Sequence, residues 1–241
     1  MGGLAILLAA FVAGLAGQPV SPAETAESVL AHNLEARGFD RWKPFYTMRL
    51  RGTVTSRGKT VPVLVLRKRP NRLRQETAFD AGTVIAAFDG RRAWAINPFS
   101  GSDAPRRLTG SEVDDAAAQA DFDGPLVDPA AHGFAVALVG AESVDGRPAY
   151  RLRLKKPGSP GQDFLIDATT WLEIKSVTTV SRDGRPATLE TAFDDYRSVD
   201  GVMVPFRIVT SIGGQTVSVM QVERVDLGVP IADALFVMPK N

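Results

Sequence analysis

The sequence predicts a mainly β fold with a few helices (α+β), built on one antiparallel sheet whose concave face is buried. Two observations support this prediction. From about residue 45 onward, β-branched and aromatic residues alternate with polar ones, which is typical of strands with one buried face. Asp-Gly pairs between these runs indicate hairpins, and they stand at Asp89-Gly90, Asp145-Gly146, Asp183-Gly184 and Asp200-Gly201. Because so long a sheet does not stay flat, we expect strong curvature.

The first expected element is a helix in SPAETAESVLAHNLEARGF, with Ser21 as its N-cap, Pro22 in its first turn and Gly38 at its end. The alternating runs then predict strands at 46–56, 60–69, 72–79, 83–88, 91–96, 133–144, 147–156, 163–167, 171–181, 187–198, 202–212 and 215–225. Two further segments have helical or irregular character: SEVDDAAAQADF after Gly110, and the closing PIADALFVMP.

Residues 1–17 are expected to form a secretory signal peptide, which leaves 18–241 as a single domain. The apolar run from Gly2 to Gly17 is shorter than the roughly 17–25 residues of a membrane-spanning helix. It lacks the usual basic start, so an uncleaved anchor is the alternative. The chain contains no cysteine, and hence neither a disulfide nor a lipid-attachment site. We therefore expect a protein exported to a bacterial periplasm.

The charge pattern argues against nucleic-acid binding. The chain has 28 Lys+Arg and 27 Asp+Glu, so no broad positive field surrounds it. The basic stretch LRKRPNRLR is local, and it reads as two strands joined at Pro70-Asn71. In that arrangement its cations divide between the two faces, with Arg67 and Arg69 on one face and Lys68 on the other, while Arg72 and Arg74 share a face.

The chemically reactive side chains do not suggest an enzyme. With no Cys and only His32 and His132, thiolate or three-histidine zinc sites are excluded, and we expect no cofactor and no metal. His132 follows Asp128 by four residues, and these two residues could belong to a Ser–His–Asp hydrolase site. No G-x-S-x-G segment supplies a nucleophile, so this hydrolase is disfavoured.

Several segments resemble the periplasmic lipoprotein carrier family LolA and the wider group of outer-membrane lipoprotein-sorting proteins. The specific part is LRKRPNRLRQETAF followed by the hairpin AAFDGRRAWAINPF, with Pro70-Asn71, Asp89-Gly90, Trp94 and Asn97-Pro98-Phe99 in matching order. Weaker similarity extends through GPLVDPAAHGFAVALVG, DGRPAYRLRL and FDDYRSVDGVMVPFRI to the C-terminus.

The resemblance implies a half-open β-barrel with helices covering its concave face, and a hydrophobic cavity that holds acyl chains of a lipoprotein or another lipid. Such a carrier acts between an inner-membrane transporter and an outer-membrane receptor, and we expect a monomer. The apolar residues expected to bind lipid are Leu64, Leu66, Phe79, Phe88, Trp94, Phe99, Phe134, Leu138, Phe164 and Phe206, although each of them also fits an ordinary core position.

Arg69 and Arg72 are expected at the rim, where they would meet anionic head groups or a partner. The alternative from another functional class is a periplasmic sensor module of the same fold, which binds a membrane-protein partner and uses lipid as a signal.

Overall fold

One antiparallel sheet organises the chain. The structure, a computed structural model, describes residues 24–182 and 184–239. The sheet contains β1 (Thr47–Ser56), β2 (Lys59–Lys68), β3 (Arg72–Phe79), β4 (Gly82–Phe88), β5 (Ala93–Asn97), β6 (Ser102–Arg107), β7 (Ala135–Val144), β8 (Arg147–Lys155), β9 (Gln162–Asp167), β10 (Glu173–Arg182), β11 (Arg185–Val199), β12 (Val202–Ile212) and β13 (Gln215–Leu227).

The strand order is β6-β5-β4-β3-β2-β1-β13-β12-β11-β10-β9-β8-β7. Neighbours are joined by short hairpins except at the centre, where the last strand returns to the first, with Met48 opposite Leu227. The mainly β, antiparallel architecture predicted from the sequence is confirmed. The sheet remains open, with β6 and β7 as its edges. It is not strongly curled, whereas the sequence predicted strong curvature. It buries apolar side chains on both faces, so curling is not its only means of covering them.

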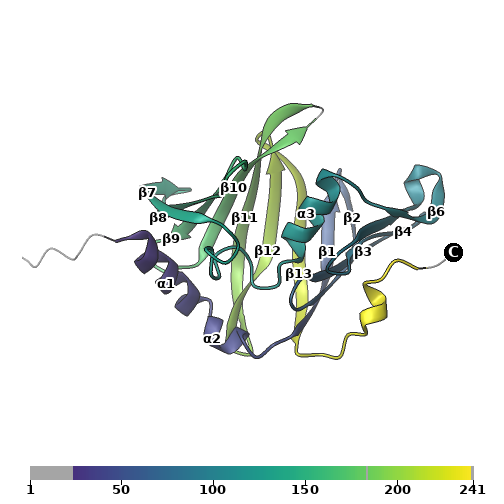
Figure 1. Cartoon of the computed structure of the whole chain (residues 1–241), viewed down its shortest axis with the longest axis horizontal. Helices are drawn as coiled ribbons and strands as arrows, with labels where there is room; N and C mark the ends of the chain where they lie inside the picture. The colour runs from purple at the N-terminus through teal and green to yellow at the C-terminus, as the bar shows by residue number, and fades with distance from the viewer. Residues whose placement is uncertain (1–23, 183, 240–241) are drawn as a thin grey trace, which may run out of the picture.

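Three helices lie against one face of the sheet, called here the inner face (Figure 1). They are α1 (Ala26–Ala36), α2 (Phe39–Trp42) and α3 (Ser111–Ala120). A capping box between Thr25 and Ser28 starts α1, whereas the predicted cap Ser21 lies outside the described residues, as does the predicted signal peptide. Gly38, with φ +72°, follows the end of α1 as predicted. No helix among the described residues is long and apolar enough to cross a membrane.

The inner face carries the larger buried clusters. Leu50, Val65 and Leu73 from three neighbouring strands pack with Trp42 of α2 and with Phe122, which follows α3. Towards β7, a second cluster places α1 on the sheet and contains Val29, Leu126, Leu152, Leu154, Phe164 and Ile166. Asn33 of α1 is fully buried, and its amide donates to the carbonyl of Trp171 at 2.8 Å. The helices are therefore fixed to the sheet at both ends of the inner face.

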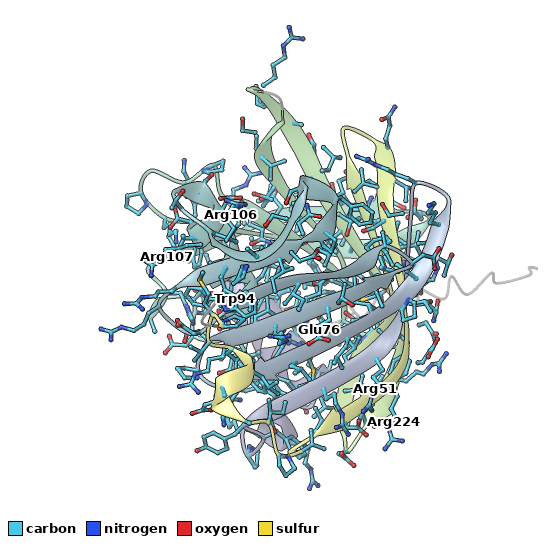
Figure 2. The ribbon with its side chains drawn as sticks, turned by 90° about the vertical axis from the view of Figure 1, so that its right-hand side faces the viewer. Arg51, Glu76, Trp94, Arg106, Arg107 and Arg224 are labelled. Atoms are coloured by element: carbon cyan, nitrogen blue, oxygen red, sulfur yellow. The ribbon has the colours of Figure 1, made fainter. Side chains whose placement is uncertain are left out.

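The opposite, outer face is partly covered by the end of the chain. Residues 229–237, called here the C-terminal strap, contain the short 3-10 helix η2 (Asp233–Leu235) and cross this face near Trp94 (Figure 2). Ile231 and Phe236 of the strap pack on Leu66, with Leu64 beside them. Beyond the strap the outer face is charged, as where Asp226 binds Arg49, Arg51 and Arg224 at 2.6 to 3.2 Å.

Leu64, Leu66 and Trp94, three of the residues expected to bind lipid, therefore lie on the outer face. The pairing register shows this directly: Leu66 stands opposite Arg74, Arg74 opposite Ala87, and Ala87 opposite Trp94. Residues paired across a sheet share a face. Val65 and Leu73 occupy the alternate positions and point to the inner cluster.

Candidate binding cavity

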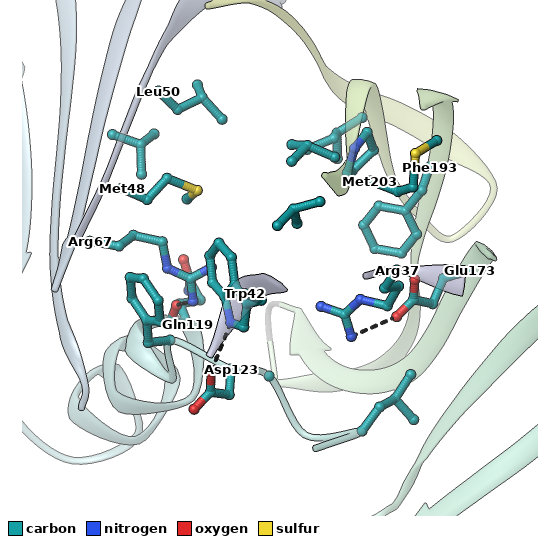
Figure 3. Close-up of a pocket in the computed structure, with 18 of the residues that line it drawn as sticks. Arg37, Trp42, Met48, Leu50, Arg67, Gln119, Asp123, Glu173, Phe193 and Met203 are labelled. Carbon is teal, nitrogen blue, oxygen red and sulfur yellow. Dashed lines mark hydrogen bonds and ion pairs between the residues drawn. The ribbon is translucent and has the colours of Figure 1, made fainter. Parts of the chain in front are cut away.

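A cavity of about 440 Å³ lies between the inner face and the helices (Figure 3). Its volume falls within the range of roughly 300–1,000 Å³ that is usual for small-molecule sites. Side chains from strands between β3 and β9 line it, including Leu73 on one side and Phe164 and Glu173 on the other. The loop 122–126, which follows α3, and α2 contribute the remaining wall.

Most of the lining is apolar. The strands contribute Met48, Leu50, Val65, Leu73, Phe164, Phe193, Val202, Met203, Val204, Pro205, Ile208 and Met220, and the helices and the loop contribute Phe39, Trp42, Phe122, Pro125 and Leu126. Trp42 and Phe122 stack with their ring centroids 4.6 Å apart. The three methionines add flexible, polarisable side chains, which adapt to ligands of varied shape.

One polar group of the cavity centres on Glu173 at the start of β10. Arg37, just after α1, approaches its carboxylate at 3.1 Å, and the hydroxyl of Tyr196 donates to its backbone carbonyl at 2.8 Å. Burial raises the pKa of Tyr196, so its phenol stays protonated. The arginine and the carboxylate balance each other, and this end of the cavity carries no net charge from the pair.

A second polar group lies on the side of β2. Arg67 donates through Nη2 to the backbone carbonyls of Gln119 and Asp121, at 2.8 and 2.5 Å. Burial lowers the pKa of Arg67, but an arginine remains charged at any physiological pH. Nearby, the indole of Trp42 donates to Asp123 at 2.8 Å. Figure 3 shows Arg67, Gln119 and Trp42 together on this side of the cavity.

The residues predicted to bind lipid are distributed over several places. Phe164 lines the cavity. Phe88 and Phe206 are buried in the cluster next to it, and Phe134 and Leu138 pack against the cluster under α1. Phe79 and Phe99 contact each other edge-to-face near the hairpin of β3 and β4, with their ring centroids 5.2 Å apart. Phe99 is 60% exposed there. Leu64, Leu66 and Trp94 lie on the outer face beneath the strap.

The two predicted rim arginines already have partners within the chain. Arg69 forms an ion pair with Asp123, donates to the carbonyl of Phe45 at 2.7 Å, and lies over the ring of Phe122 at 4.6 Å. Arg72 pairs with Asp233 of the strap at 2.5 Å. The cations of LRKRPNRLR do divide between faces as predicted. Arg69 fixes the segment around Asp123, and Arg72 fixes the strap.

Sequence reasoning missed several lining residues, including Trp42, Met48 and Phe193. Met48 and Leu50 stand two residues apart along β1 and so share a face of the strand. This spacing was the signal in the sequence that both could line a cavity. Trp42 lies in a four-residue helix whose packing no local pattern indicates. Phe193 precedes a distortion at Asp195, whose positive φ of 52° interrupts the alternation along β11.

The histidine considered for catalysis has a different carboxylate neighbour from the one expected. His132 Nδ1 lies 3.7 Å from Asp121, whereas Asp128 accepts a hydrogen bond from the backbone N–H of Ala131. Within residues 24–182 and 184–239, no group of three or more His, Asp or Glu side chains is arranged to hold a metal ion.

No protein-family model matches the sequence, and no curated protein matches it significantly. Solved structures do match. A LolA superfamily protein from Nitrosomonas europaea has a TM-score of 0.58 at 20% identity, over 89% of this chain and 98% of that one. A putative outer membrane lipoprotein-sorting protein domain from Vibrio parahaemolyticus gives 0.59 at 11% identity, over 88% and 97%.

A DUF1329 family protein from Desulfovibrio piger gives a TM-score of 0.60 at 15% identity, over 89% of this chain and 98% of that one. These similarities cover 88–89% of the chain. They agree with the family resemblance of the KRPN turn and the Asp-Gly hairpin that follows it. The chain shares its fold with these solved structures, one of which is a LolA superfamily protein.

Proposed function

We propose that the protein is a carrier that binds acyl chains of a lipid or lipoprotein in the cavity between sheet and helices. The observation that supports this most directly is the cavity itself, whose lining is mostly apolar from β3 to β9 and whose volume suits a small ligand. Each methylene moved from water into such a site contributes roughly 0.8 kcal/mol. A chain of ordinary length thus supplies enough free energy for binding without any covalent step.

The proposed role includes a periplasmic location and transfer toward the outer membrane. Two considerations support it: the apolar run at residues 2–17, and the fold shared with proteins named for lipoprotein sorting. Because binding of a chain is reversible, transfer would need a donor and an acceptor of different affinity. An inner-membrane transporter and an outer-membrane receptor are the corresponding partners.

The test is native mass spectrometry of the protein purified from its own periplasm, combined with titration of a fluorescent fatty acid. We expect co-purified lipid, and we expect probe binding at micromolar concentration. Val204→Trp places a large ring in the cavity and should weaken probe binding at least tenfold, whereas Val139→Trp, at an exposed position on β7, should not. Absence of both lipid and probe binding would overturn the proposal.

The same preparation separates the carrier from a sensor module. If the protein instead captures a membrane-protein domain through its sheet, and Val204→Trp leaves that complex intact, the sensor function gains support and the carrier function loses it.

A further inference from the structure

Arg67 differs from the other cations of the basic stretch. Lys68 and Arg72 approach Asp233 at 2.6 and 2.5 Å, Arg69 pairs with Asp123, and Arg74 approaches Glu76 at 2.5 Å. Arg67 has no carboxylate within 4.0 Å among the residues that the structure describes, and its hydrogen bonds go only to backbone carbonyls. It is the cation of this stretch that points to the cavity.

The Arg67 guanidinium also has unused hydrogen-bonding capacity. Its Nε is buried and, among residues 24–182 and 184–239, meets no acceptor. A buried donor without an acceptor is costly, and the cost falls when an acceptor arrives. The planar guanidinium can give parallel hydrogen bonds to a carboxylate or a phosphate. Arg67 can therefore accept an anionic oxygen as a partner, which none of the residues described by the structure supplies to its Nε.

The surrounding charges leave this side of the cavity receptive to an anion. Asp123 is engaged by Arg69 and by the indole of Trp42. Asp121 uses its backbone carbonyl for Arg67, while its carboxylate faces His132 at 3.7 Å. Arg37, across the cavity, is also positively charged, but its ion pair with Glu173 neutralises that charge. Of the charged side chains that line the cavity in the described part of the chain, Arg67 is left without a carboxylate within 4.0 Å, although Asp121 and Asp123 act on it from further away.

We propose that the ligand of this cavity is an acyl chain with an anionic head group, a carboxylate or a phosphate, and that Arg67 binds this head group. The proposal rests on the proposed function, because the chain must occupy the apolar part of the cavity while the head group lies on the side of β2. It makes the preferred ligand a free fatty acid or a phosphate-bearing lipid rather than a neutral acyl ester.

The test compares ligands of equal chain length, namely lauric acid, lauryl phosphate and lauryl alcohol, as competitors of a fluorescent fatty acid at neutral pH. For the unmodified protein we expect the anionic pair to bind at least tenfold more tightly than the alcohol, because a hydrogen bond to a charged group is stronger than one between neutral groups. The acid and the phosphate compared with each other identify the type of head group.

Arg67→Gln should remove the preference for the anionic ligands while leaving lauryl alcohol binding within about twofold, because the apolar lining is retained. Arg74→Gln is the matched control: its guanidinium lies on the outer face, donates to the carbonyl of Leu235 at 2.8 Å, and should not affect the preference. Circular dichroism and retained alcohol binding show that each variant is folded.

The outcomes separate the two proposals. If the unmodified protein binds none of the three ligands, the carrier function fails. If it binds acid, phosphate and alcohol equally, the carrier function stands and the role of Arg67 is refuted. If Arg67→Gln does not fold, the comparison of ligands on the unmodified protein still decides whether the cavity prefers anionic head groups. Arg67→Lys then serves as the second variant, because it retains the charge and loses the planar guanidinium. In Arg67→Lys, the ratio of affinity for the anionic ligands to affinity for lauryl alcohol should be less than half of that in the unmodified protein.

Discussion

The indole N–H of Trp94 donates to the backbone carbonyl of Phe236 at 2.8 Å, across 142 residues of sequence. Both groups are buried, so the bond ties the C-terminal strap to the face of the sheet that is opposite the cavity. Arg74 lies over the Trp94 ring at 5.4 Å and donates to Leu235, which adds a second attachment. The strap is thus firmly attached to the outer face of the sheet.

Trp94→Phe removes this donor and leaves the Phe236 carbonyl buried without its partner. We expect a loss of about 1–3 kcal/mol in the free energy of unfolding. Hydrogen exchange should show faster opening of residues 229–237 than of β1. Affinity for a fluorescent fatty acid should not change, because Trp94 lies on the outer face. A loss of ligand affinity with unchanged strap protection would contradict this account.

Attachment of the strap should depend on pH in the acid range. Hydrogen bonds from Lys68 and Arg72 lower the pKa of Asp233 to about 2, against 3.8 ordinarily. A carboxyl group whose pKa is depressed by folding contributes its full stabilisation above the unfolded pKa, and this contribution is lost as pH falls through the folded pKa. Strap protection should therefore decline between about pH 4 and pH 2.

Hydrogen exchange or Trp94 fluorescence followed over that pH range would measure the decline. Asp233→Asn should abolish the pH response and give the weakened attachment at all pH values. Asp195→Asn is the control, since Asp195 also has a lowered pKa but pairs with Arg197, away from the strap. An identical pH response in the Asp233 and Asp195 variants would exclude the proposed linkage.

The two predicted rim arginines should respond very differently to substitution. Arg69 is 17% exposed and bonds to Asp123 and the Phe45 carbonyl, so Arg69→Ala should cost roughly 2–4 kcal/mol of unfolding free energy. Arg72→Ala removes one of two cations from an exposed carboxylate and should cost at most about 1 kcal/mol. Chemical denaturation measures both, and equal costs would contradict this assignment.

Gly52 allows β1 and β13 to approach each other at a register shift. A Cβ at this position would lie 2.1 Å from the backbone oxygen of Gln221. Gly52→Ala should therefore displace one strand and destabilise the protein by roughly 2–4 kcal/mol. Gly58→Ala, in a turn with positive φ but open space, should cost only about 1–2 kcal/mol. A thermal melt of each variant would distinguish them.

The hairpins were predictable because their signals are local. Asp145-Gly146 and Asp200-Gly201 provide the positive φ values that their tight turns require, and the flanking strands lie close to the predicted ranges. β6 was missed because SDAPRR has neither alternation nor β-branched residues. It becomes a strand by pairing with β5, a contact that depends on the neighbouring strand rather than on its own composition.

The position of the cavity was only partly predictable, because β2 is apolar on both faces. In VPVLVLRK the alternation separates Val63 and Val65 from Leu64 and Leu66, but it does not say which set faces a cavity. The answer depends on Phe236 and the rest of the strap, far away in the sequence, which cover one of the two sets. Charge gave no help, since each face receives cations from the same basic stretch.

The open sheet has a consequence for self-association. An unpaired edge strand offers its backbone to any neighbouring copy, and proteins commonly prevent this with proline, charge or a bulge. The edge strand β6 carries Pro105 within a run of Asp103, Arg106 and Arg107, and Arg106 pairs with Glu112 of α3. At the other edge, β7 has a bulge between Leu138 and Gly140, with Val139 51% exposed. Joining of two copies through their sheets is thus discouraged strongly at one edge and more weakly at the other.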